Sequence, residues 1–333
     1  MSIKVGIYGA SGYAGQDLVE LLRTRSDVEI VFGTSDSYAG EGIPGTGLSY
    51  IPHDDAPLEA VDAVFLALPH KASAPVARRA LNAGVRVIDL SADLRLKTAE
   101  IYREWYGIDH PHPELLPTPY GLPELHRDQV TENTQAVAVP GCYPTATLLG
   151  LYPLLKHQAL VPGTPFIVDA KSGVSGAGRT PKANTHFVEA YGNLSPYSPG
   201  RSHRHVGEIE QEIDALMPLA GPVIFTPHLV PIDRGLLASI YVTLNGGIGA
   251  DEAQSLYEET YDSEPLVDVL PAGQQATMRH AQRKNNCAIS LTPVNGTYLH
   301  ITSVIDNLRK GASSQAIQNF NLMFGLDETT GLM

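Results

Sequence analysis

A doubly wound α/β domain is the fold that the first part of this sequence predicts, and three features predict it. Short apolar runs have the length and composition of strands in a buried parallel sheet. Helix-like segments alternate with these runs, and each run ends in polar or glycine-rich residues, where such domains bind their ligands. The runs lie at residues 3–8, 28–34, 61–68, 85–90 and 136–139.

A second domain is expected because 333 residues exceed the usual size of one hydrophobic core. Beyond Cys142 the pattern changes to runs that indicate an α+β domain with a mixed sheet, at 166–170, 223–228, 236–244 and 299–306. A last helix, at 313–324, is expected to pack back on the first domain. We therefore assign 1–141 and 307–333 to the first domain and 142–306 to the second.

The composition excludes several classes of protein. Lys and Arg number 23 against 36 Asp and Glu, a formal charge of −13, which argues against a general nucleic-acid or membrane-surface binder. No apolar run approaches the roughly 18 residues of a membrane span. The two cysteines form no disulfide framework, and no Cys/His spacing indicates a metal site. With no signal-peptide pattern at the start, we expect a cytoplasmic protein with free thiols.

Residues 9–15, G-A-S-G-Y-A-G, follow the first apolar run directly and precede a helix pattern. A strand, a glycine-rich turn and a helix in this order are the context of a dinucleotide-binding fingerprint, here spaced G-x-x-G-x-x-G. The glycines let the backbone approach a pyrophosphate, and the helix N-terminus favours its charge. The alternative is an ordinary tight turn.

The second apolar run ends in Ser35, Asp36 and Ser37, about 20 residues after the turn. This is the position where dinucleotide-binding domains contact the adenosine ribose of the cofactor. Asp36 could accept from the ribose hydroxyls, which favours NAD. The hydroxyls of Ser35 and Ser37 could instead hold a 2′-phosphate, which favours NADP. A solvated loop is the third interpretation.

Cys142 is the candidate nucleophile. It follows a Pro-Gly turn at the end of the fifth apolar run and precedes the helix-like run 146–157. Unpaired N–H groups and the helix dipole favour a thiolate there, and a thiolate is a strong nucleophile. The alternative is a buried core thiol, as most free cysteines are.

Three further segments carry candidate site residues. Arg95 lies on a loop after the fourth run, where it could hold phosphate or be a surface cation. The glycine- and serine-rich loop 171–179 could cradle an anion through its backbone N–H groups or be a flexible turn. In Ser202–Val206, we expect an extended lead-in that projects His203 and His205 to one side, and either could serve Cys142 as base and acid.

Together these segments resemble the N-acetyl-γ-glutamyl-phosphate reductase family over the whole chain. The matching segments, beside G-A-S-G-Y-A-G, are V-I-D-L-S-A-D-L-R-L at 87–96, Y-G-L-P-E-L at 120–125, P-G-C-Y-P-T at 140–145, K-S-G-V-S-G-A-G-R at 171–179, H-R-H-V-G-E-I-E-Q at 203–211, F-T-P-H-L-V-P at 225–231 and V-I-D-N-L at 304–308.

The resemblance implies NADPH-dependent reduction of an acyl phosphate to an aldehyde by a homo-oligomer, a dimer or tetramer. It implies a fold like aspartate-semialdehyde dehydrogenase, with a dinucleotide (Rossmann-type) domain, a catalytic and dimerisation domain and a returning C-terminal helix. Cys142 is then the nucleophile and His205 or His203 the acid/base. The implied NADP contacts are Gly9, Ser11, Gly12, Tyr13, Ala14, Ser35, Asp36, Ser37, Ser175, Gly176 and Asn307. The implied substrate or phosphate contacts are Arg95, Lys182 and Arg201.

Two residues depart from the family pattern. Asp36 stands where many relatives carry a basic residue, and Gly207 stands where the family usually has proline. Two related families are the next alternatives: first the enzymes acting on carrier-bound aminoadipyl phosphate, then the aspartate-semialdehyde dehydrogenases. Both typically show G-C-N-A-T where this chain has G-C-Y-P-T, so the resemblance to them is weaker. A catalytically silent NADP-binding protein, with Cys142 and both histidines merely packed, is the alternative of another class.

Overall fold

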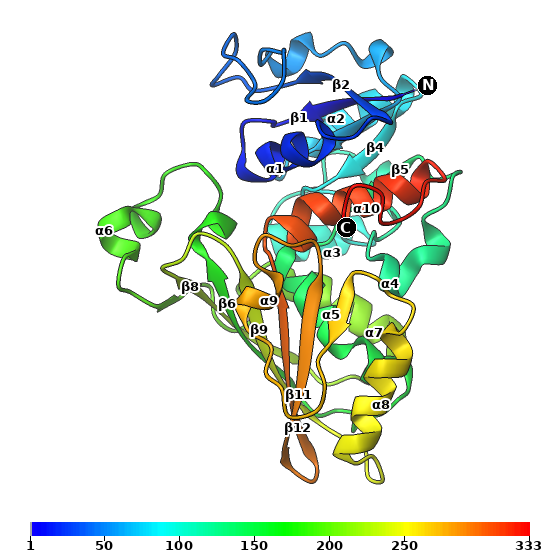
Figure 1. Cartoon of the computed structure of the whole chain (residues 1–333), viewed down its shortest axis with the longest axis vertical. Coiled ribbons are helices and arrows are strands. Elements are labelled where there is room, and N and C mark those ends of the chain that lie inside the picture. The colour runs from blue at the N-terminus through cyan, green and yellow to red at the C-terminus, as the bar shows by residue number, and fades with distance from the viewer. Residues whose placement is uncertain (1) are drawn as a thin grey trace. The chain divides into compact units, whose positions relative to one another are not determined.

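The structure is a computed structural model that describes residues 2–333. The chain forms two compact units, residues up to 141 together with 312–333, and residues 142–311. Each unit is built on one sheet, as the sequence predicts, and Figure 1 labels their elements. Within residues 2–333, no helix is long and apolar enough to cross a bilayer.

A five-stranded sheet with the order β2-β1-β3-β4-β5 forms the first unit, and all its neighbouring strands are parallel. The central strands are buried on both faces, which explains their continuous apolar sequences. The strands are β1 (Ile3–Tyr8), β2 (Val28–Gly33), β3 (Ala63–Leu66), β4 (Arg86–Asp89) and β5 (Ala136–Ala138). The predicted doubly wound domain is therefore confirmed.

Helices from both ends of the chain complete this unit. The helices are α1 (Tyr13–Leu22), α2 (Ser73–Asn82), α3 (Ala99–Tyr106), α4 (Pro123–His126) and α10 (Ser314–Met323). The C-terminal helix α10 contacts α1 and β4, so it returns to the first unit as expected. Its Asn319 and Gln315 donate to the carbonyl of Gly121 at 2.8 and 2.9 Å. These buried amide contacts hold α10 in a defined place.

Two buried aspartates organise the carboxyl end of β4. Asp89 accepts from the hydroxyls of Ser73 (2.6 Å) and Ser91 (2.9 Å). Asp93 accepts from the N–H groups of Ser73 and Ala74 at 3.2 and 3.0 Å, and so caps the start of α2. Burial raises the pKa of Asp89 from its ordinary value of 3.8 to about 6, with Asp93 adding to the rise.

We expect the stability of the first unit to fall as pH rises from about 4 to about 6, because folded Asp89 keeps its proton longer than unfolded Asp89. The rise to about 6 corresponds to about 3 kcal/mol, and that cost is complete above pH 6. Urea unfolding of the parent and of Asp89→Asn between pH 4 and 7 measures it. The stability of the variant relative to the parent should increase over this range. A difference that does not change with pH would contradict the assignment.

A seven-stranded mixed sheet with the order β10-β11-β12-β9-β6-β8-β7 forms the second unit. Pairs β6·β8 and β10·β11 are parallel, and the other neighbours are antiparallel. The strands are β6 (Phe166–Gly173), β7 (Ser195–Pro196), β8 (Val223–Val230), β9 (Leu236–Thr243), β10 (Val267–Val269), β11 (Cys287–Asn295) and β12 (Tyr298–Ile305). The helices are α5 (Cys142–Lys156), α6 (Phe187–Ala190), α7 (His205–Leu216), α8 (Ala250–Tyr261) and α9 (Met278–Ala281).

The helix α5 lies at the centre of this unit. It contacts β9, β12, α7 and α8, and most of its residues are buried. Pro153 inside it has no N–H, so the carbonyl of Leu149 lacks its helical partner. The hydroxyl of Tyr261 on α8 donates to that carbonyl at 2.5 Å, and Tyr257 donates to the next one, Gly150. Two tyrosines thus fasten α8 to the helix that begins at Cys142.

We expect Tyr261→Phe to destabilise the second unit by about 1–3 kcal/mol, because the buried carbonyl of Leu149, which Pro153 cannot pair, would lose the Tyr261 hydroxyl. Chemical unfolding followed by circular dichroism measures the change. Tyr298→Phe is the matched control, since Tyr298 is 54% exposed and should lose little stability. Equal losses in the two variants would contradict this role of Tyr261.

Several element boundaries differ from those expected. The helix α5 begins at Cys142 itself rather than at 146, because proline is tolerated in a first helical turn. The strand β6 runs to Gly173, three residues further than expected. The strand β11 and the helix α3 were not anticipated.

Candidate active site

Cys142 is a partly exposed free thiol at the first position of α5. The first N–H groups of a helix have no intrahelical acceptor, and with the helix dipole they favour negative charge at this end. The helix has 15 residues, so the dipole is well developed. The side chain therefore lies where a thiolate is stabilised.

Aromatic rings pack closely beside Cys142. The next residue, Tyr143, is buried, and its ring centroid lies 5.2 Å from that of Phe225 and 5.7 Å from that of His203. The hydroxyl of Tyr197 donates to the hydroxyl of Tyr143 at 2.9 Å. Burial raises the pKa of both tyrosines, and the negative charge of a Cys142 thiolate raises it further. The thiol and the tyrosine pair thus share one electrostatic environment, and the sequence analysis did not single out Tyr197.

Both predicted histidines join this cluster. Their rings lie 4.8 Å apart, and the ring of His205 lies 6.0 Å from that of Tyr143. The expected extended lead-in is wrong: Arg204 has helical backbone angles and α7 begins at His205, so the two histidines are neighbours on a turn. The two histidines thus pack on Tyr143, the residue that follows Cys142.

The two histidines have different surroundings. Burial, and then the charge of Arg204, lower the pKa of His203 to about 4, so it is neutral at pH 7. The N–H of His205 donates to Nδ1 of His203 at 3.2 Å. Neutral His203 therefore carries its proton on Nε2 and is a hydrogen-bond donor there.

A second group of predicted residues also comes together in this unit. The amide Nδ2 of Asn307 donates to the hydroxyl of Ser175 at 2.9 Å, and its Oδ1 accepts from the N–H of Gly235 at 2.8 Å. A Cβ on Gly176 would come within 2.9 Å of the Ser172 hydroxyl. Asn307 thus ties the loop after β6 to the loop before β9.

The three predicted substrate cations lie in different surroundings. Arg95 is half-buried and donates to the carbonyls of Val139 (2.8 Å) and Leu90 (2.7 Å), at the ends of β5 and β4. Arg201 forms a two-pronged ion pair with Glu210, at 2.5 and 2.9 Å. Lys182 is exposed, near the start of the segment that leads to α6. Its Nζ donates to the carbonyl of Ala177 at 3.4 Å.

The glycine-rich turn of the first unit has the geometry of a phosphate-binding turn. Gly9 adopts a φ of +73°, and a Cβ there would meet the Ala67 carbonyl oxygen at 2.4 Å. A Cβ on Gly15 would lie 2.3 Å from the Gly9 oxygen, so only glycine allows this packing. Gly12, at the N-cap of α1, faces open space except for the Gly9 oxygen. These residues fit a dinucleotide, because backbone and helix N-terminus are left accessible.

The residues predicted to contact the adenosine of the cofactor are held in place by hydrogen bonds between loops. The hydroxyl of Ser11 donates to that of Ser35 at 2.7 Å, which joins the turn to the end of β2. Asp36 accepts from the N–H of His53 at 2.9 Å, and its second oxygen lies 3.7 Å from Nε2 of the same histidine. Its side chain stays 66% exposed. The acid is thus available to a nearby ligand while it fixes the loop at His53.

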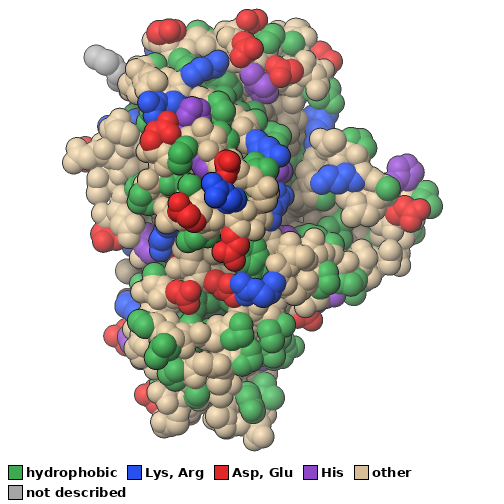
Figure 2. Space-filling view, turned by 180° about the vertical axis from the view of Figure 1, so that it is seen from behind, with side chains coloured by type: hydrophobic (Ala, Val, Ile, Leu, Met, Phe, Trp, Pro, Cys, Tyr) green, Lys and Arg blue, Asp and Glu red, His purple; other side chains and the backbone are tan. Residues whose placement is uncertain are grey.

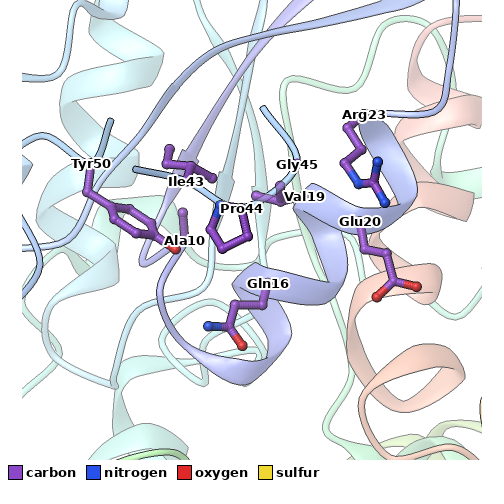
Figure 3. A pocket seen from close by; sticks show the side chains of 9 residues that line it. All are labelled: Ala10, Gln16, Val19, Glu20, Arg23, Ile43, Pro44, Gly45 and Tyr50. Carbon is purple, nitrogen blue, oxygen red and sulfur yellow. The ribbon is translucent and has the colours of Figure 1, made fainter. Parts of the chain in front are cut away.

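A cavity of about 290 Å³ lies beside this turn, between α1 and the loop that precedes residue 51 (Figure 3). Its lining residues are Ala10, Gln16, Val19, Glu20, Arg23, Ile43, Pro44, Gly45 and Tyr50. Only Ala10 belongs to the predicted turn, and no residue of the cavity was expected to bind the cofactor. Nothing in the local sequence pattern indicates a cavity there. Within residues 2–333, no group of three or more His, Cys, Asp or Glu is placed to hold a metal ion.

Comparison with known families accounts for both units. Residues 4–133 match the family described as semialdehyde dehydrogenase, NAD binding domain. Residues 142–307 match semialdehyde dehydrogenase, dimerisation domain. The family that carries these two domains is therefore a family of NAD(P)-dependent oxidoreductases that form homo-oligomers.

Among solved structures, aspartate semialdehyde dehydrogenase II from Vibrio cholerae is similar in fold, with a TM-score of 0.77 at 20% identity. The match covers 97% of this chain and 98% of that one. Aspartate semialdehyde dehydrogenase from Candida albicans, solved with NADP, gives a TM-score of 0.72 at 14% identity over 97% of this chain. At these identities the likeness shows the fold alone.

Relatives in sequence are considerably closer. The N-acetyl-gamma-glutamyl-phosphate reductase of Moorella thermoacetica is 46% identical over 99% of this chain and 98% of its own length. Those of Citrifermentans bemidjiense and Azotobacter vinelandii are each 44% identical with the same coverage. The chain therefore belongs to the N-acetyl-gamma-glutamyl-phosphate reductase family of semialdehyde dehydrogenases.

Proposed function

We propose that this enzyme reduces N-acetyl-L-glutamyl 5-phosphate to N-acetyl-L-glutamate 5-semialdehyde with NADPH and releases phosphate, a step of arginine biosynthesis. The observation that carries the proposal is the cluster at the start of α5. Cys142 begins this helix, and His203 and His205 pack against the ring of the next residue, Tyr143. Full-length relatives carry the name of this reaction. We place the enzyme in the cytoplasm, where a reducing compartment keeps Cys142 a free thiol.

The first half of the reaction transfers the acyl group to sulfur. The Sγ of Cys142 attacks the carbonyl carbon of the acyl phosphate, and the carbon–oxygen bond breaks with its electron pair leaving on phosphate. The oxyanion that forms in between is stabilised by the N–H groups at the start of α5 and by the helix dipole. The product of this half is a thioester on Cys142.

The second half releases the aldehyde. NADPH, when bound, supplies the hydride that reduces the thioester carbon. A histidine protonates the resulting oxyanion to give a thiohemiacetal on Cys142, and then takes that proton back as the carbon–sulfur bond breaks. Cys142 leaves as a thiolate, which the helix N-terminus favours, and is ready for the next acyl phosphate.

We assign the acid/base role to His205. Its neighbour His203 has a pKa lowered to about 4 and uses Nδ1 as an acceptor, so it is a poor base near neutral pH. His203 suits a fixed donor through Nε2 instead, toward the substrate or the oxyanion. We further propose that Arg95, Lys182 and Arg201 gather the anionic groups of the substrate, with Lys182 reaching from its exposed segment.

We propose that the first unit holds NADPH at its glycine-rich turn. Gly9, Gly12 and the N–H groups of Ser11, Tyr13 and Ala14 would hold the pyrophosphate. The further proposed contacts are Ser35, Asp36 and Ser37 at the adenosine end, and Ser175, Gly176 and Asn307 from the second unit. The tight packing of Gly9 and Gly15 supports this assignment, since any side chain there would distort the turn.

Asp36→Arg should raise the preference for NADPH over NADH by about tenfold or more, because unit charges about 4 Å apart in water interact by about 1 kcal/mol and the 2′-phosphate carries up to two. Binding constants for the two cofactors, measured by fluorescence titration, test this. Asp54→Arg is the control, since Asp54 is an exposed acid in the next loop. An unchanged ratio in Asp36→Arg would show that Asp36 does not face the adenosine end.

We propose that two copies of the chain associate through the face of the seven-stranded sheet that α5 does not cover. Four of its strands each expose one large apolar side chain on this face: Ile167 on β6, Ile224 on β8, Tyr241 on β9 and Tyr298 on β12. Figure 2 views the molecule from behind and shows apolar side chains at the surface in the part of the picture where Figure 1 draws β11, β12 and α8. Tyr241→Asp should shift the sedimentation coefficient toward the monomer, and an unchanged value would contradict this interface.

The reverse reaction tests the proposed function. Purified enzyme is mixed with phosphate, NADP or NAD, and either N-acetylglutamate semialdehyde or aspartate semialdehyde, and absorbance of the reduced cofactor is followed. We expect phosphate-dependent turnover with N-acetylglutamate semialdehyde and NADP. Preference for aspartate semialdehyde would instead assign the specificity of the structural neighbours, and no turnover with either would favour a silent NADP-binding protein.

A further inference from the structure

A buried turn at the end of β12 packs directly against the candidate nucleophile. We call residues 306–311 the Asp306 turn. A Cβ built on Gly311 of this turn would lie only 2.8 Å from the Cβ of Cys142 and 3.2 Å from the carbonyl oxygen of Asp306. No left-handed backbone angle is recorded for Gly311, so the need for glycine is steric. The Asp306 turn is thus the wall against which the Cys142 side chain rests.

The side chain of Asp306 holds this turn in shape. It is fully buried, and its Oδ1 accepts from the N–H groups of Leu308 at 2.8 Å and Arg309 at 3.2 Å. The backbone carbonyl of the same residue accepts from the N–H of Gly311 at 2.9 Å. Side-chain and main-chain acceptors of one residue therefore set the path from β12 to Gly311.

The same carboxylate also fastens the turn to two other loops of the second unit. Its Oδ2 accepts from the N–H of Arg283, after α9, at 2.7 Å. The guanidinium of Arg234, from the loop between β8 and β9, lies 4.0 Å from Oδ1 and is itself largely buried. Removing one of these donors should lower the stability of the fold, because the buried negative charge of the carboxylate would then lack a compensating hydrogen bond.

We propose that Asp306 is a positioning residue for Cys142: it fixes the turn whose glycine sets the place of the nucleophilic side chain. The proposal rests on the role of Cys142 proposed above. Asp306 does not touch the reacting atoms in this account. It acts through Gly311, so disturbing either residue should move the thiol relative to the helix N–H groups and the histidines.

Two variants and a control test the proposal. Asp306→Asn keeps the shape but places an amide N–H₂ against backbone donors, and Gly311→Ala adds the Cβ that meets Cys142. Gly249→Ala is the control, because a Cβ on Gly249 has nothing within 4 Å in the same unit. The readouts are kcat and KM of the reverse reaction, and the rate of Cys142 alkylation by iodoacetamide against pH, followed by mass spectrometry of the Cys142 peptide.

We expect kcat of Asp306→Asn and Gly311→Ala to fall by about a hundredfold with KM nearly unchanged, since a displacement of about 1 Å costs this much. The pH profile of Cys142 alkylation should move to higher pH, as the thiolate loses its stabilisation. Gly249→Ala should behave as the parent. Proteins are compared after circular dichroism has shown them to be folded, so a general loss of structure is not mistaken for misplacement.

Unchanged kcat and alkylation profiles in folded Gly311→Ala would overturn the proposal, whether or not Asp306→Asn folds. So would losses that match the unfolded fraction or that appear equally in Gly249→Ala. If Gly311→Ala does not fold, Gly311→Ser with the same readouts decides in its place. Failure of the proposed function looks different, because the parent would then show no phosphate-dependent turnover with N-acetylglutamate semialdehyde, while the alkylation profiles of these variants would still report the place of the Cys142 thiol.

Discussion

Replacing Cys142 by serine should abolish turnover while cofactor binding stays intact. The serine hydroxyl is not ionised near neutral pH, so the helix N-terminus has no anion to stabilise and no thioester forms. We expect kcat to fall by about 10⁴-fold or more, the scale seen when a nucleophile is removed. Steady-state assays of the reverse reaction and a fluorescence titration with NADPH measure the two parts of this prediction.

Cys287 provides the matched control for this experiment. It is the other thiol of the chain, fully buried on β11, with its sulfur 3.4 Å from the Ser303 hydroxyl. Cys287→Ser should keep kcat close to that of the parent, because its sulfur lies in the sheet core and in no proposed site. Substantial turnover in Cys142→Ser would remove Cys142 as the nucleophile.

His205→Asn should lower kcat by about 10²- to 10⁴-fold, the usual contribution of a general acid/base. The loss should exceed that of His203→Asn, because His203 is neutral at working pH and serves as a fixed donor. Steady-state kcat values of the parent and the two variants in the reverse reaction measure both losses.

The order of the two losses decides the assignment. A larger loss of kcat in His203→Asn than in His205→Asn would give His203 the acid/base role. Both rings pack against Tyr143, so unfolding temperatures of the two variants are compared first. Equal thermal stability with unequal kcat then reports on chemistry rather than packing.

The first unit could be predicted well because its strands are buried on both faces. Residues 3–8 form one apolar run in the sequence and one strand in the structure, and the glycine-rich residues after them indicate a turn. The second unit was harder. The strand β11 ends in exposed residues and includes Pro293, which weakens a strand pattern. In the first unit, α3 escaped prediction because it buries only Tyr102, so its sequence looks polar.

The candidate site could be predicted only in part. Cys142 and the two histidines carry their chemistry in residue type and local sequence, so the sequence alone allowed them to be proposed. Tyr197 is 54 residues from Tyr143, and Gly311 is far from Cys142 in the chain, so their contacts arise only from tertiary packing. The turn at Arg204 also escaped prediction, because helix α7 starts at a histidine without a side-chain cap.

Burst kinetics of the reverse reaction test the central claim most directly. Enzyme mixed with N-acetylglutamate semialdehyde and NADP, without phosphate, should form about one NADPH per chain and then stop, because the thioester on Cys142 has no acceptor. Mass spectrometry should find the N-acetylglutamyl group on the Cys142 peptide, and added phosphate should restart turnover. Steady turnover without a burst, or an acyl group absent from Cys142 after the burst, would contradict the account.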